Sequence, residues 1–180
     1  MLNKSKLLTI IIGSIALFPL NIPANAAPKI TNQSKVYING IGSVFVGMTV
    51  AQASKAAGTS LVRERYGDYQ CSYYYLQNGT KDIAFMVTKG RIARVDVLKG
   101  KTSTASGARI GDTETRIKTL YPGQIKVSRH AYNDKGHYLT FVPKDKADKN
   151  FGVVFETDGK QVTQYRSGKN PEVQFVEGCS

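Results

Sequence analysis

Two stretches of the chain alternate apolar runs with turn residues in the same order. Each has an apolar run, a short turn and a second apolar run, which is the pattern of a β-hairpin. The turns are Lys89-Gly90 and Asp158-Gly159, a constant offset of 69. The four predicted strands span residues 83–88, 91–97, 152–157 and 160–165.

Upstream of each hairpin, apolar residues recur at helical spacing. The two segments align at an offset of 64 and predict short helices over residues 49–57 and 113–121. Thr49 followed three residues later by Gln52 is typical of a capping box. Gly58 ends the first helix, and Pro122-Gly123 ends the second.

A strand between each helix and its hairpin completes the predicted unit. Residues 71–77 supply it in the first copy, and residues 137–142, paired with 125–132, supply it in the second. We therefore predict an α+β fold of two tandem repeats, each a short helix packed on an antiparallel sheet, spanning 27–105 and 106–180. The alternative is a chance similarity between two ordinary α+β stretches.

The residues at the start of the first helix carry a resemblance. An aliphatic residue, then Gly47-Met48-Thr49, then Ala53, within Val44–Ala53, resembles the start of the helical element in the β-lactamase inhibitory protein superfamily. The outer-membrane assembly lipoprotein BamE belongs to the same broad structural group. The resemblance implies a binding role and a two-repeat layout. The chain departs from BamE in lacking a cysteine at the predicted mature start, and no inhibitor contact residue is carried over.

The first 26 residues have the three parts of a secretion signal. Lys4 and Lys6 precede an uncharged apolar run over residues 7–20, and Ala24-Asn25-Ala26 offers small residues for cleavage. The run is shorter than the roughly 20 residues that span a bilayer. We predict a signal peptide over 1–26, a periplasmic or secreted chain from Ala27, and no remaining transmembrane anchor. The alternative is an uncleaved anchor helix.

Cysteine use agrees with export. Cys71 and Cys179 are the two cysteines of the chain, and in an oxidising compartment such a pair predicts one disulfide. That bond closes a long loop and ties the C-terminus to the first repeat. Two separate reactive thiols are the alternative, which no CxxC motif supports.

The formal net charge of +12 narrows the choice of partners. Without the signal, 23 Lys and Arg face 13 Asp and Glu, a net charge of +10. One interpretation of this excess is solubility together with adhesion to anionic envelope surfaces, and the other is a specific acidic partner. Nucleic acid is not expected, because the basic residues are scattered and an exported protein rarely meets it.

Five of the ten tyrosines lie between residues 63 and 75. On a strand, Cys71, Tyr73 and Tyr75 share one face, and Ser72, Tyr74 and Leu76 share the other. Tyr and Arg dominate binding hot spots, although tyrosines also favour half-buried strands without any function. The candidate binding residues are Arg63, Arg65, Tyr66, Tyr69 and Tyr74.

The remaining polar residues favour no catalytic or metal site. Pairing Tyr132 with His137 places His130 and His137 on one face, but no third ligand has a suitable spacing, so ordinary surface histidines are expected. No catalytic motif or cofactor loop occurs, and Asp112 and Glu114 suit a helix start. We expect a non-catalytic exported binding module, protein-binding or inhibitory. The alternative is a binder of anionic envelope glycan or lipid head groups.

Overall fold

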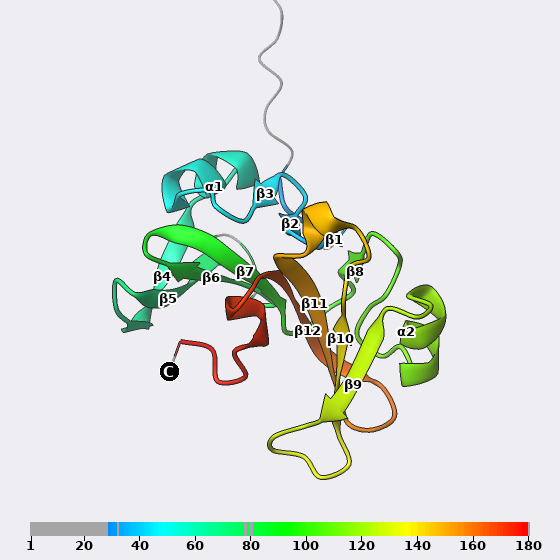
Figure 1. The fold of residues 1–180 in the computed structure, drawn as a ribbon. Coiled ribbons are helices and arrows are strands. Elements are labelled where there is room, and N and C mark those ends of the chain that lie inside the picture. The colour runs from blue at the N-terminus through cyan, green and yellow to red at the C-terminus, as the bar shows by residue number, and fades with distance from the viewer. Residues whose placement is uncertain (1–28, 32, 78, 80, 180) are drawn as a thin grey trace, which may run out of the picture.

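The computed structural model describes residues 29–31, 33–77, 79 and 81–179 of the chain (Figure 1). The predicted signal peptide, residues 1–26, lies outside the described residues. Two short α-helices, a large antiparallel sheet and a small mixed sheet make up the fold of this described part. The predicted α+β class is confirmed.

Eight strands of the described chain form one continuous sheet. Its order is β4-β5-β6-β7-β12-β11-β10-β9, and every neighbouring pair is antiparallel. The bounds are β4 Leu61–Gly67, β5 Cys71–Leu76, β6 Ile83–Thr88, β7 Arg91–Val97, β9 Ile125–Arg129, β10 His137–Phe141, β11 Phe151–Thr157 and β12 Val162–Lys169. The second half repeats the first in reverse spatial order, so the two predicted repeats share one sheet joined at β7 and β12.

Equivalent hydrogen bonds recur in the two halves of this sheet. The Gly47 amide donates to the Ile92 carbonyl at 2.8 Å, and the Gly111 amide donates to the Val162 carbonyl at 2.9 Å. The two donors, Gly47 and Gly111, are 64 residues apart, and the two acceptors, Ile92 and Val162, are 70 residues apart. The hairpins are therefore offset by 70 residues, and the predicted offset of 69 is wrong by one. The reason is the turn: Asp158 pairs with Gln161, which centres the second turn on residues 159–160.

Both helices form where the sequence predicts them. α1 (Val50–Ala57) begins at the Thr49 cap, where Thr49 and Gln52 complete the capping box, and it ends at Gly58 in the left-handed conformation. α2 (Glu114–Leu120) begins at Thr113, whose side chain accepts from the Arg116 amide. The two helices lie toward opposite ends of the large sheet (Figure 1).

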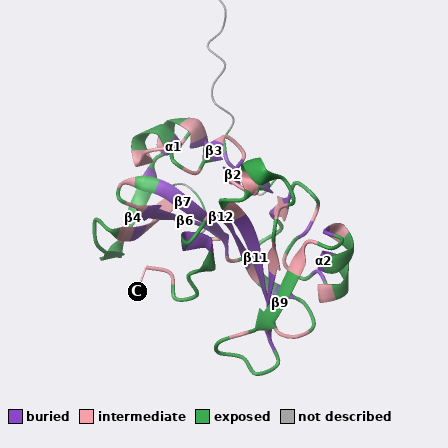
Figure 2. Ribbon diagram, in the orientation of Figure 1, coloured by how far each residue is buried: buried purple, intermediate pink, exposed green. Residues whose placement is uncertain are grey.

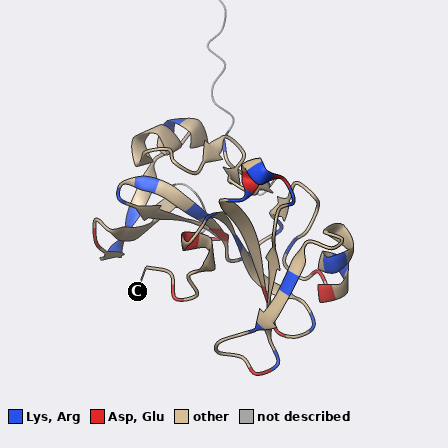
Figure 3. Cartoon of the chain, viewed as in Figure 1, with Lys and Arg blue, Asp and Glu red and all other residues tan. Residues whose placement is uncertain are grey.

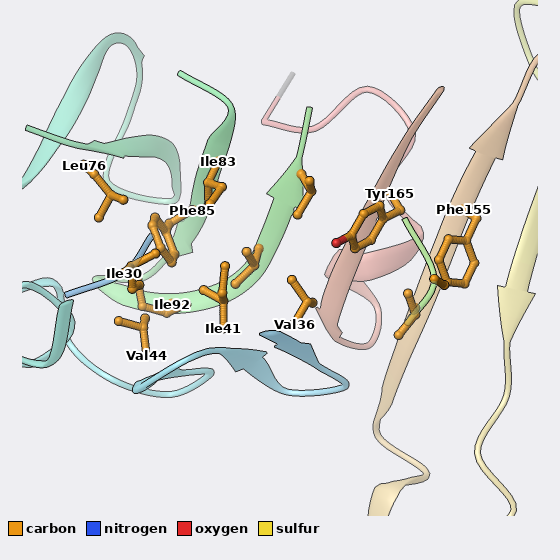
Figure 4. Packing of buried hydrophobic residues seen from close by; sticks show 14 of the residues in the cluster. Ile30, Val36, Ile41, Val44, Leu76, Ile83, Phe85, Ile92, Phe155 and Tyr165 are labelled. Atoms are coloured by element: carbon orange, nitrogen blue, oxygen red, sulfur yellow. The ribbon is translucent and has the colours of Figure 1, made fainter. Parts of the chain in front are cut away.

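A second, four-stranded sheet packs against the same face of the large sheet as the helices. Its order is β3-β2-β1-β8, with bounds β1 Lys35–Tyr37, β2 Gly40–Ile41, β3 Val44–Phe45 and β8 Ser103–Thr104. Val36, Ile41 and Val44 point from it toward the large sheet, where Phe85, Ile92 and Tyr165 belong to the same core (Figure 4). Sequence patterning did not predict these strands, because two- and three-residue strands show no periodicity.

The main core therefore lies between the large sheet and the helix-bearing layer. Strand residues that face it include Phe85, Val95, Phe155 and Tyr165, all at most 1% exposed. The opposite face of the sheet carries a smaller cluster of Tyr138, Val154 and Val173. Central strands are buried on both faces, whereas β4 and β9 at the edges are largely exposed (Figure 2).

The C-terminal tail covers that opposite face. It contains the 3₁₀ turn η2 (Glu172–Gln174), and another such turn, η1 (Lys146–Asp148), precedes β11. Val173 of the tail is fully buried. The predicted disulfide between Cys71 and Cys179 is confirmed and joins the end of the tail to β5, across a sequence separation of 108. Such a bond agrees with an oxidising compartment outside the cytoplasm.

The predicted pairing of β9 with β10 is wrong by three residues. His137 lies opposite Arg129 and not opposite Tyr132. The physical reason is a longer connection: the chain leaves the ladder after the His130 amide bonds the Gly136 carbonyl at 3.0 Å. A shift by an odd number of residues moves the side chains of one strand to the other face relative to its partner strand. The two histidines therefore do not share a face.

Candidate binding surface

The edge strand β4 contains a wide bulge in the tyrosine-rich segment. Arg63 lies opposite Tyr74 and Gly67 lies opposite Ser72, so residues 64–66 face Tyr73 alone. Extra residues in one strand bend it away from the regular ladder and redirect their side chains. Arg65 and Tyr66 lie within this bulge and are exposed.

Arg63 holds the two ends of this bulge together. Its Nε donates to the Ser72 hydroxyl at 3.0 Å, and its Nη2 donates to the Gly67 carbonyl at 2.7 Å. Gly67 has a φ of +100°, and a Cβ there would lie 2.7 Å from the Cys71 carbonyl oxygen. A predicted binding residue thus has a structural task, because two of its guanidinium nitrogens hold the bulge, although its side chain is exposed.

Two of the predicted tyrosines are strongly exposed. Tyr66 on the bulge is 78% exposed, and Tyr69 in the turn between β4 and β5 is 73% exposed. The turn itself is closed by Asp68, whose carboxylate accepts from the amides of Gln70 and Cys71 at 2.8 and 2.9 Å. Arg65 is exposed beside Tyr66. These three side chains, Arg65, Tyr66 and Tyr69, are called the tyrosine edge below.

Tyr74, the fifth predicted residue, lies apart from the tyrosine edge. It is partly buried and packs against the main core, on the same face of β5 as the buried Ser72 and Leu76. The predicted division of β5 into two faces is confirmed by this burial pattern. The position of Tyr74 therefore favours the structural interpretation for that residue.

A hollow of about 620 Å³ lies along the bulge and is lined by Arg65 and Tyr66 together with Glu64, Tyr75 and Lys81. The Tyr75 hydroxyl donates to Glu64 at 3.3 Å, and Lys81 Nζ lies 3.5 Å from the same carboxylate. Burial and the Glu64 charge raise the pKa of Tyr75, so its hydroxyl keeps its proton. Sequence reasoning missed Glu64, Tyr75 and Lys81 as parts of one site, because they lie on β4, on β5 and in the turn before β6.

Beneath the C-terminal tail lies a network of buried charges that sequence reasoning also missed. Arg94 is 2% exposed and binds Asp96 at 2.9 and 3.0 Å. Its Nη1 donates to the main-chain carbonyls of Glu172 and Phe175, both at 2.8 Å. The guanidinium therefore does two things at once: its Nε and Nη2 neutralise a buried carboxylate, and its Nη1 holds the tail.

A second buried arginine repeats this arrangement on β12. Arg166, 4% exposed, pairs with Glu156 and donates to the Val173 carbonyl at 2.7 Å. The signal in the sequence for this second, polar face was on β7, where the charged residues Arg94 and Asp96 alternate with Val95 and Val97. Its role in the described chain is to anchor the tail across the sheet.

The histidines occupy separate and partly enclosed positions. His130 stacks on Tyr138 at 4.6 Å and lies 3.4 Å from Glu156, with its side chain 14% exposed. His137 Nδ1 lies 2.8 Å from Glu114 Oε1, which also accepts from Thr157 at 2.6 Å. The expectation of two ordinary surface histidines is therefore wrong for His130. Among the described residues no group of three potential ligands is placed to hold a metal ion.

No helix within the described ranges is both long and apolar enough to cross a bilayer.

Neither a known protein family nor a curated protein sequence matches the chain. Among solved structures, the uncharacterized protein yfeY from Escherichia coli is similar, with 15% sequence identity and a TM-score of 0.49. The match covers 75% of this chain and 99% of that one. That protein is itself uncharacterized, so the likeness assigns no activity. The resemblance to the β-lactamase inhibitory protein superfamily stays a prediction.

Proposed function

We propose that this chain is an exported, non-catalytic binding module that recognises a protein partner through its tyrosine edge. The observation that carries the proposal is the exposure of two large aromatic side chains, Tyr66 and Tyr69, on a backbone that is already fixed. Tyrosine offers a large contact area and a hydroxyl at a small cost in side-chain entropy. We favour a protein as the partner, which this module would bind or inhibit.

Rigidity of the tyrosine edge supports this proposal. Arg63 bridges the bulge, Asp68 closes the adjoining turn, and the disulfide from Cys71 ties β5 to the tail. A surface whose backbone is ordered before binding loses less conformational entropy when a partner covers it. The hollow beside Tyr66 adds a concave element that a partner side chain can enter.

A capture experiment followed by titration tests the proposal. The exported, disulfide-bonded protein is used as bait for envelope and extracellular extracts, and each captured protein is then purified and titrated against the native form and variants. We expect Tyr66→Ala and Tyr69→Ala each to weaken binding about 30-fold, the effect of a side chain worth about 2 kcal/mol.

Tyr37→Ala is the matched control, because Tyr37 is also exposed, at 44%, but lies on the small sheet. Its binding should equal that of the native protein. Salt distinguishes the alternative function, because binding to anionic glycan or lipid falls steeply as ionic strength rises, whereas a desolvated aromatic interface changes little. Equal binding by all variants, with release by salt, would contradict the tyrosine edge as the site.

A further inference from the structure

The strand β9 forms the edge of the large sheet opposite the tyrosine edge. Among the described residues it pairs with β10 alone, through five consecutive residue pairs without a register shift. The other edge strand, β4, is interrupted by its bulge between Arg63 and Gly67. β9 is therefore the edge of this sheet that offers a regular template for another strand.

The pairing with β10 fixes which peptide groups of β9 point outward. The Val142 amide donates to the Gln124 carbonyl at 2.8 Å, and the His130 amide donates to the Gly136 carbonyl at 3.0 Å. Hydrogen-bonded pairs alternate along an antiparallel ladder, so residues 126 and 128 also bond β10. The amide and carbonyl groups of Ile125, Val127 and Arg129 consequently point away from the sheet.

The side chains of β9 define what can lie against this edge. Val127 is 47% exposed, although a valine at a strand position is usually covered. The charged residues of the strand are Lys126 and Arg129, both exposed, and it carries no acidic residue. Figure 3 shows this cationic character as blue segments on β9. A second copy of the chain offers no carboxylate on its β9, so pairing of β9 with itself would gain no pair of opposite charges.

We propose that β9 binds an extended acidic segment of a partner protein, which adds as an antiparallel ninth strand. Three outward peptide groups supply the main-chain hydrogen bonds, as in other strand-addition complexes. Directly opposed residues share a face, so the segment needs an apolar residue opposite Val127 and carboxylates opposite Lys126 and Arg129. The site is independent of the tyrosine edge, which lies at the other end of the sheet.

The probe is the peptide acetyl-Glu-Thr-Val-Glu-Val-amide, whose order matches these requirements in the antiparallel direction. It is titrated to about 1 mM, the range of weak peptide binding, into the isotope-labelled, disulfide-bonded protein. We expect shifted resonances and slowed hydrogen exchange at the amides of Ile125, Val127 and Arg129. The same peptide with both Glu replaced by Lys should bind at least about tenfold more weakly.

The variant Val127→Pro tests the main-chain bonds directly. Proline removes an outward amide while leaving the bonds from residues 126 and 128 to β10, which an edge position tolerates. We expect at least tenfold weaker binding, whereas the matched control Val127→Thr, which keeps the amide, should bind as the native protein does. The double variant Lys126→Glu/Arg129→Glu introduces no proline into the strand. It should bind the Lys peptide more tightly than the Glu peptide.

Several outcomes would overturn the proposal. They are the absence of any perturbation at β9 at the highest peptide concentration, equal binding of the Glu and Lys peptides, and undiminished binding by folded Val127→Pro. Perturbation of residues 61–67 in place of β9 would assign the segment to the other edge. Concentration-dependent protection of β9 without peptide would assign the edge to a second copy, which also contradicts the proposal.

Discussion

Arg94 links the polar face of the sheet to the C-terminal tail, and its replacement by methionine tests that link. The substitution keeps a long apolar stem but removes the guanidinium from Asp96, from the Tyr73 hydroxyl and from the carbonyls of Glu172 and Phe175. Asp96 would remain buried, at 7% exposure, without its cationic partner. Leaving one member of a buried ion pair uncompensated costs about 3–5 kcal/mol.

The dependence on pH gives this prediction a second signature. Burial raises the pKa of Asp96 above its ordinary value even beside Arg94, and loss of the guanidinium raises it further. A carboxyl group with a raised pKa favours the folded state below its unfolded pKa, and this contribution is lost as pH rises through the folded value. The cost of Arg94→Met should therefore grow between about pH 4 and pH 7.

Urea unfolding of the oxidised protein, followed at both pH values, measures these differences. The double variant Arg94→Met/Asp96→Leu should regain part of the stability, because no charge stays buried without a partner. Hydrogen exchange of the tail amides should become faster in both variants, since the two carbonyl bonds are lost. A cost below about 1 kcal/mol, or a double variant no more stable than the single one, would refute this account of Arg94.

Two further predictions concern the disulfide and the start of α2. Cys71→Ser/Cys179→Ser should destabilise the protein by up to about 5 kcal/mol, because the bond closes a loop over 108 residues, and a melting temperature unchanged on reduction would contradict this. At Glu114, burial opposes ionisation, but hydrogen bonds from Thr157 and His137 outweigh it and lower the pKa. A lowered pKa stabilises the fold above the unfolded value and loses that effect as pH falls through the folded one. Glu114→Gln should thus flatten the fall in melting temperature between about pH 5 and pH 3, and an unchanged slope would exclude Glu114 as its source.

The candidate site was only partly predictable from sequence. Tyr66 and Tyr69 are exposed, as a binding surface requires, whereas Arg63 bridges the bulge and Tyr74 packs on the core. Whether a tyrosine on a strand faces solvent depends on the register and the covering layer, and neither is written in the local pattern. The bulge at 64–66 has no sequence signal of its own. It arises because the stretch from Arg63 to Gly67 is longer than the stretch of β5 that it faces, from Ser72 to Tyr74.

The sequence by itself determined the elements whose causes are local. The Thr49 cap and Gly58 stop bound α1, short glycine-containing turns set the two hairpins, and a lone pair of cysteines left one disulfide to form. These features depend on residues a few positions apart or on composition alone.

The tertiary structure alone decided how the repeats join and what covers each face. Pairing β7 with β12 merged two sheets into one, and the tail closed over the charged face through Arg94 and Arg166. The β7–β12 pairing and the bond from Arg94 to the tail link residues about 70 or more positions apart, as between Val97 and Tyr165. Which of these contacts form depends on which faces remain to be buried once the local elements exist. That is a property of the whole chain, and no short pattern encodes it.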